Sequence, residues 1–104
     1  MQIQVNTDHH IPGHEELVTQ VEEAVIKALH RFGTQITRVE VHLSDENGNK
    51  SGANDKRCVL EARLEGHQPV AVSHQAETLK QAYTGAATKL KTALSHALDK
   101  LSTH

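Results

Sequence analysis

Hydrophobic and polar residues alternate along four segments of the chain. Alternation over residues 2–7 and again over 36–43 places the apolar side chains of each segment on one face, which is typical of half-buried strands. A third alternating segment covers residues 56–65. The turn formers of residues 66–69 follow it, and a short apolar segment comes next at 70–73. The pattern therefore predicts four strands.

Two further segments repeat their apolar residues every three or four positions, as amphipathic helices do. The first runs from His14 to Gly33, with Glu15 and Glu16 in the first turn, where acidic groups favour the positive end of the helix dipole. The second begins at Gln75 and continues to Leu101, which corresponds to roughly 39 Å at 1.5 Å per residue. Ile26 lies off the first apolar stripe, and the pattern does not explain it.

The order strand, helix, strand, strand, strand, helix predicts an α+β fold, with residues 1–104 forming a single domain. A right-handed crossover should make the first two strands parallel, and the short turn at 66–69 should make the last two antiparallel. Each strand has one apolar phase and each helix has one apolar stripe. We therefore expect a four-stranded mixed sheet with both helices packed on one face and the other face in water.

Composition narrows the class of protein. No apolar run approaches the roughly 18 residues that a membrane span needs, and the N-terminus lacks the basic start and apolar stretch of a secretory signal. We therefore expect a cytoplasmic domain without a membrane partner. Cys58 is the sole cysteine, which excludes an intrachain disulfide and cysteine-based zinc modules. Cys58 lies on the inward-facing phase of the third strand, where a buried, inert thiol is more common than a nucleophile.

Nine histidines raise the question of a metal site. His9, His10 and His14 lie close together, but Pro12 and Gly13 interrupt their spacing and no third fixed ligand is evident, so surface histidines are the better interpretation. The chain also shows no nucleophile with a base, no paired carboxylates and no Gly-rich phosphate loop. We expect no enzyme activity, no cofactor, no bound metal and no small-molecule substrate.

The charge of the chain is unevenly distributed around a net value of -2. Residues 1–33 hold two basic residues against five acidic ones, whereas residues 75–104 hold four lysines against two acidic residues. Phe32 and Tyr83 are the only aromatic residues, which disfavours folds that bind RNA by stacking bases on exposed rings. A local lysine patch on the last helix could contact phosphates, and the alternative is a lysine-rich solvated face.

A second group of basic residues lies around the third strand. Lys56 and Arg57 follow the long polar segment 44–55, at a strand end that a partner could reach, and they are candidates for binding. Arg38 and Arg63 lie on the outward phase beside glutamates. Pairing across strands is the simpler explanation for these two arginines.

Short motifs accompany this order of elements. They are Ile11-Pro12-Gly13-His14-Glu15 at the first helix, Asp55-Lys56-Arg57-Cys58 and Leu60-Glu61-Ala62-Arg63-Leu64 in the third strand, and Ala82-Tyr83 with Lys89-Leu90 in the last helix. Together with the order and length of the elements, they resemble the N-terminal domain of the ribosome hibernation-promoting and ribosome-associated translation inhibitor (sigma-54 modulation protein) family. The chain differs from the usual family pattern at Thr78 and Lys80, where an acidic residue and an aromatic are typical.

The resemblance implies a βαβββα domain, similar in architecture to double-stranded RNA-binding domains. Such a domain would bind rRNA in the decoding region of the small ribosomal subunit and act as a translation modulator or hibernation factor under stress. Binding would depend on shape and charge rather than on base identity. The RNA-binding residues that we expect are Lys56, Arg57, Lys80, Lys89, Lys91 and Lys100.

A non-catalytic protein-interaction module is the alternative. A helix of roughly 39 Å exceeds the length of a five- or six-residue strand, so Leu94, Leu98 and Leu101 would overhang the sheet. Exposed leucines there would favour self-association through the C-terminal helix. We therefore expect a monomer or a weak homodimer.

Overall fold

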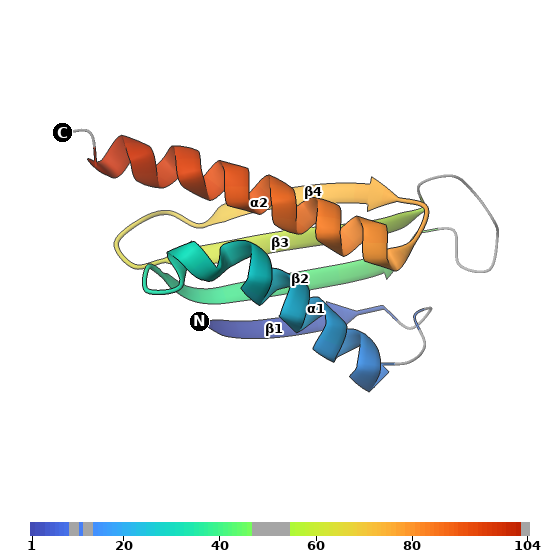
Figure 1. The fold of residues 1–104 in the computed structure, drawn as a ribbon. Helices are drawn as coiled ribbons and strands as arrows, with labels where there is room; N and C mark the ends of the chain where they lie inside the picture. The colour runs from blue at the N-terminus through green and yellow to red at the C-terminus, as the bar shows by residue number, and fades with distance from the viewer. Residues whose placement is uncertain (9–10, 12–13, 47–54, 103–104) are drawn as a thin grey trace.

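The computed structural model is a four-stranded sheet with two helices on one of its faces (Figure 1). It describes residues 1–8, 11, 14–46 and 55–102, of which His14 and residues 100–102 are described by their backbone alone. In chain order the elements are β1 (Gln2–Thr7), α1 (His14–Leu29), the 3-10 turn η1 (His30–Phe32), β2 (Ile36–Asp45), β3 (Lys56–Leu64), β4 (Val70–Ala76) and α2 (Leu79–Ser102). The predicted α+β class and βαβββα order are confirmed.

The strands lie in the order β1-β2-β3-β4, so β1 and β4 are the two edges of the sheet. β1 runs parallel to β2, with Ile3 opposite Val39, whereas β2 with β3 and β3 with β4 pair antiparallel. This pairing confirms the predicted directions of the first and last strand pairs. The register also determines which charged side chains meet on the open face.

Both helices cover the same face, with α1 over the β1 side of the sheet and α2 over β3 and β4 (Figure 1). The predicted inward phases of the strands meet the apolar stripes of the helices there. Fully buried residues of this core include Val21, Val25, Val39, Val41, Cys58, Leu60, Leu90 and Leu94. Removal of these side chains from water is the main stabilising term of the fold. Within the part of the chain that the structure describes, no helix is both long and apolar enough to cross a membrane.

The boundary between β4 and α2 differs from the prediction. β4 continues to Ala76, and α2 begins at Leu79 instead of Gln75. Thr78 caps the helix, because its hydroxyl accepts a hydrogen bond from the Gln81 N–H at 3.1 Å. Local apolar spacing does not show this boundary, since pairing of β4 with β3 decides where the strand ends.

The predicted overhang of α2 is wrong for Leu94, which is fully buried. β2 and β3 contain 10 and 9 residues, longer than assumed. At about 3.3 Å per residue they extend roughly 30 Å beneath the helix. Leu98 is half-buried and packs against the same core. The side chain of Leu101 lies outside the described residues, so the leucines that are described do not form an exposed edge.

At Gly85, α2 packs closely against His74 of β4. A Cβ atom added at this position would collide with the imidazole of His74 and would lie only 2.9 Å from its Cγ. His74 is on the inward phase of β4, opposite Cys58 on β3. The absence of a side chain at Gly85 therefore lets the imidazole fit under the helix.

Replacing Gly85 with alanine is expected to destabilise the protein. In a helix interior alanine is more favourable than glycine by about 1 kcal/mol, but overpacking a filled site costs about 1 to 3 kcal/mol. Urea unfolding should show a lower midpoint for Gly85→Ala. In that background His74→Ala should recover part of the loss, because it removes the ring that the new methyl group meets. A higher midpoint for Gly85→Ala alone would contradict this account.

Candidate functional site

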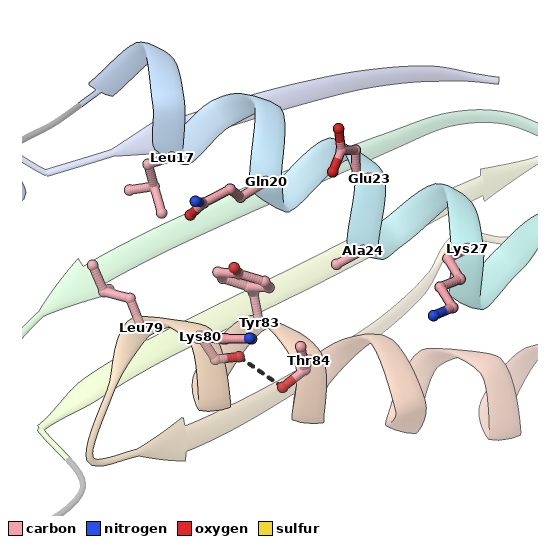
Figure 2. Close-up of a pocket in the computed structure, with 9 residues that line it drawn as sticks. All are labelled: Leu17, Gln20, Glu23, Ala24, Lys27, Leu79, Lys80, Tyr83 and Thr84. Atoms are coloured by element: carbon pink, nitrogen blue, oxygen red, sulfur yellow. Dashed lines mark hydrogen bonds between the residues drawn. The ribbon is translucent and has the colours of Figure 1, made fainter.

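A groove lies between the outward sides of α1 and α2 (Figure 2). One part has a volume of about 570 Å³ and the adjoining part a volume of about 370 Å³, and the two share Ala24, Lys27 and Thr84. We call this continuous depression the interhelical groove. Its lining residues are Leu17, Gln20, Glu23, Ala24, Lys27, Ala28, Leu79, Lys80, Tyr83, Thr84, Ala87, Thr88 and Lys91.

Small and apolar side chains form the floor of the interhelical groove. Ala24 and Ala28 on α1 face Ala87 on α2, and side chains this short leave space between the two helices. At the other end, Tyr83 points from α2 toward α1 (Figure 2). Tyr83 is only 4% exposed as a residue, and burial raises the pKa of its phenol, so this part of the floor carries no charge near neutral pH.

Three exposed lysines line the walls of the groove: Lys27 from α1, and Lys80 and Lys91 from α2. Within the described ranges, no carboxylate lies within ion-pair distance of any of these ammonium groups. Glu23 is the one acidic residue in the lining. The walls therefore present a net positive charge that an anionic ligand would neutralise.

The hydroxyl groups of the groove threonines donate their hydrogen bonds to backbone carbonyls of α2. Thr84 donates to the Lys80 carbonyl at 2.7 Å and Thr88 donates to the Thr84 carbonyl at 3.1 Å. Each hydroxyl can still accept a hydrogen bond, but neither is free to donate one to an anion in this arrangement. Recognition of an anion would therefore depend on the lysine ammonium groups, which act as point charges.

The predicted lysines of α2 do not form one row. Lys80 and Lys91 line the interhelical groove, whereas Lys89 extends to the opposite side of the helix and donates to the Ser73 carbonyl of β4 at 3.0 Å. Lys100 belongs to α2, and its side chain lies outside the described residues. The fold thus places two of the predicted residues on the groove side of α2 and a third on the opposite side.

Lys56 and Arg57 lie at the base of the long polar segment, and both have acidic partners. The Lys56 ammonium is 2.9 Å from Asp55 and 3.3 Å from Asp45. The hydrogen bond to Asp55, followed by that to Asp45, raises the pKa of Lys56 against the opposing effect of desolvation. Arg57 is 3.5 Å from Glu46. An RNA phosphate would have to compete with carboxylates at both positions.

On the open face of the sheet, the arginines pair with glutamates. Glu40 on β2 is 3.5 Å from Arg38 and 3.3 Å from Arg63, which also contacts Glu61 at 3.2 Å. Arg38 donates a hydrogen bond to Gln4 as well. Pairing across strands is confirmed for Arg63 with Glu40, whereas Arg38 with Glu40 and Arg63 with Glu61 pair within one strand. The open face has no excess of positive charge from these four residues.

Lys27 is the groove residue that the sequence interpretation missed. It belongs to the acidic N-terminal third of the chain, so its charge seemed to be outweighed. One signal was available: Gln20, Ala24 and Lys27 follow a helical spacing along one flank of the apolar stripe, where a neighbouring helix would lie.

The histidine cluster considered from the sequence falls outside what the structure describes. Neither His9 nor His10 is described, and His14 is described by its backbone alone. Among the residues whose side chains are described, no group of three or more His, Cys, Asp or Glu residues is arranged to hold a metal ion.

Comparison with solved structures supports the fold. The N-terminal domain of Thermus thermophilus Protein Y superposes with a TM-score of 0.72 at 20% identity, covering 92% of this chain and 98% of that one. A ribosomal subunit interface protein from Coxiella burnetii gives a TM-score of 0.72 at 18% identity, covering 95% of this chain and 99% of that one. At these identities the likeness establishes a shared architecture.

Comparison at the level of sequence identifies the family. No curated protein sequence matches the chain. The family model described as "Sigma 54 modulation protein / S30EA ribosomal protein" matches residues 3–102, which is nearly the whole chain. Since that match spans both helices and all four strands of the observed fold, this chain belongs to the sigma 54 modulation protein / S30EA ribosomal protein family.

Proposed function

We propose that this protein binds the small ribosomal subunit through rRNA phosphates and modulates translation as a hibernation factor in the cytoplasm. The proposal includes no catalytic step, cofactor or small-molecule substrate. Membership of a family described as ribosomal proteins supports the ribosome as the partner. The Coxiella burnetii protein of similar fold is itself named a ribosomal subunit interface protein.

The lysines of the interhelical groove are the main structural support for RNA as the ligand. Lys27, Lys80 and Lys91 line the groove without a carboxylate partner among the described residues, while the arginines of the open sheet face are already paired. Because phosphates attract exposed ammonium groups irrespective of base sequence, the helical layer is the face expected to meet the RNA backbone.

The other predicted residues have secondary roles in this proposal. Lys89 and Lys100 extend the positive charge of α2 beyond the groove. Lys56 and Arg57 would contribute less, because Asp45, Asp55 and Glu46 already offset their charge. The few available lysines predict binding of modest affinity with a clear dependence on salt.

Cosedimentation with purified small ribosomal subunits tests the proposal directly. At about 50 mM salt the protein should pellet with the subunits, and at about 200 mM salt the bound fraction should fall steeply. The reason is that the free energy gained by releasing counterions from the RNA decreases as the salt concentration rises. Large subunits at the same concentration serve as the control. Protein that stays in the supernatant at both salt concentrations would refute a small-subunit partner.

A further inference from the structure

The lysines of the interhelical groove stand on its two facing walls. Lys27 belongs to α1 and lines both parts of the groove, whereas Lys80 lines one part and Lys91 the other from α2. Figure 2 shows the Lys27 side chain extending from α1 toward α2. A polyanion that follows the groove would therefore meet Lys80 and Lys91 on one wall and Lys27 on the other.

The two lysines of the α2 wall lie on one side of that helix. Lys80 and Lys91 are separated by about three full turns, which corresponds to about 16 Å along the helix axis. A stacked nucleic acid strand places one phosphate about every 3.4 Å, so this length corresponds to about five phosphates. The groove thus offers cations along the length of a short RNA segment.

The space between the two helices suits one strand better than two. α1 and α2 pack side by side over the same face of the sheet (Figure 1), and the axes of packed helices lie about 8 to 10 Å apart. The groove exists because the facing side chains of Ala24, Ala28 and Ala87 are short. A single RNA strand can lie in such a space, whereas a duplex is wider than the separation of the helices and would touch only their outer surfaces.

The groove offers little to a nucleobase. Phe32 and Tyr83 are the only Phe, Tyr or Trp residues of the chain, and at 3% and 4% exposure neither presents a ring for stacking. The hydroxyl groups of Thr84 and Thr88 already donate to helix carbonyls. Contacts between ammonium groups and phosphates remain. A positively charged groove that follows the backbone is how proteins bind single strands without sequence preference.

We propose that the interhelical groove binds a single RNA strand rather than a duplex, with the phosphate backbone between the helices and the bases turned outward. This inference rests on the proposed function, because it takes RNA phosphates as the ligand of the groove, and it adds the form of the RNA. It differs from what the likeness to double-stranded RNA-binding domains implies. Within rRNA, it directs the protein to unpaired segments.

Fluorescence anisotropy at low salt tests the form of the RNA. The probe is a labelled RNA strand of about 12 nucleotides, within the usual range of single-strand sites, used alone or annealed to its complement. The single strand should bind the protein roughly fivefold more tightly than the duplex. A lysine patch that recognised charge alone would prefer the duplex, which has the higher charge density. Equal affinities, tighter binding of the duplex, or no binding of the single strand would overturn the proposal.

Thr84→Leu combined with Thr88→Leu tests whether the strand lies in the groove. The larger side chains fill the groove without a change in net charge, and both positions are exposed, so the fold should persist by circular dichroism. Affinity for the single strand should fall roughly fivefold. Gln81→Leu combined with Thr92→Leu is the matched control, at exposed positions of α2 outside the groove lining, and should bind like the wild type. Unchanged binding in both double variants would overturn the proposal by placing the strand elsewhere.

The two measurements separate this inference from the proposed function. If the protein pellets with small subunits but binds the duplex more tightly, the form of the RNA is wrong and the ribosomal partner stands. If the protein prefers the single strand but stays in the supernatant, the small-subunit partner is wrong and the form of the RNA stands.

Discussion

Replacing Lys27, Lys80 and Lys91 together with alanine is expected to weaken binding to small ribosomal subunits roughly a hundredfold at low salt. Each exposed ammonium contributes up to about 1 kcal/mol to an ion pair, so three of them account for about 3 kcal/mol. The slope of log affinity against log salt should become shallower by about two to three, since three fewer counterions are released. Cosedimentation across a salt series measures both quantities.

A variant with the same change in net charge on the other face is the control. Replacing Arg38, Arg57 and Arg63 with glutamine removes three positive charges from the open sheet face, where Glu40, Glu46 and Glu61 already pair with them. Its affinity and salt slope should change much less than those of the groove variant, because only Arg57 of the three is proposed to contact RNA and Glu46 already offsets its charge. Equal losses in the two triple variants would show that net charge, and not the interhelical groove, governs binding.

Raising the pH above about 9 is expected to destabilise the fold steeply because of Cys58. Burial raises the pKa of this thiol from 9.0 to about 12. Between these values the folded state keeps a proton that the unfolded state releases, so the free energy of unfolding falls as pH rises, by about 1.4 kcal/mol per pH unit. The full loss across the interval is about 4 kcal/mol. Burial also raises the pKa of Tyr83, which acts in the same direction.

Urea unfolding at intervals from pH 8 to pH 11 checks this expectation, with Cys58→Ala as the comparison. The alanine variant should be less stable at pH 8, because it leaves a small cavity beside Leu60, but its stability should fall less steeply with pH. The two curves should therefore converge as pH rises. Parallel curves would show that ionisation of Cys58 does not contribute to alkaline unfolding.

Much of the fold could be predicted from local patterns alone. A period of two along β2 and β3 assigned Val39, Cys58 and Leu60 to the buried face, and the structure buries all three. These predictions succeeded because the apolar phase of an element follows from backbone geometry, whatever the element packs against. The predicted end of the fourth strand and the predicted exposure of Leu94 were wrong. Strand pairing extends β4 to Ala76, and the length of the strands beneath α2 buries Leu94.

The candidate site depended on contacts that local patterns do not contain. Sequence patterns counted Lys56 as an available cation, but the β2–β3 register sets it beside Asp45, and its neighbour Asp55 also folds back onto it. Lys27 appeared to belong to an acidic segment, yet helix packing places it across a groove from Lys80. The sequence alone determined the elements, the buried faces and the number of lysines. The tertiary structure decided which lysines are neutralised and which line the interhelical groove, because charges interact through distances in space that only the packed fold sets.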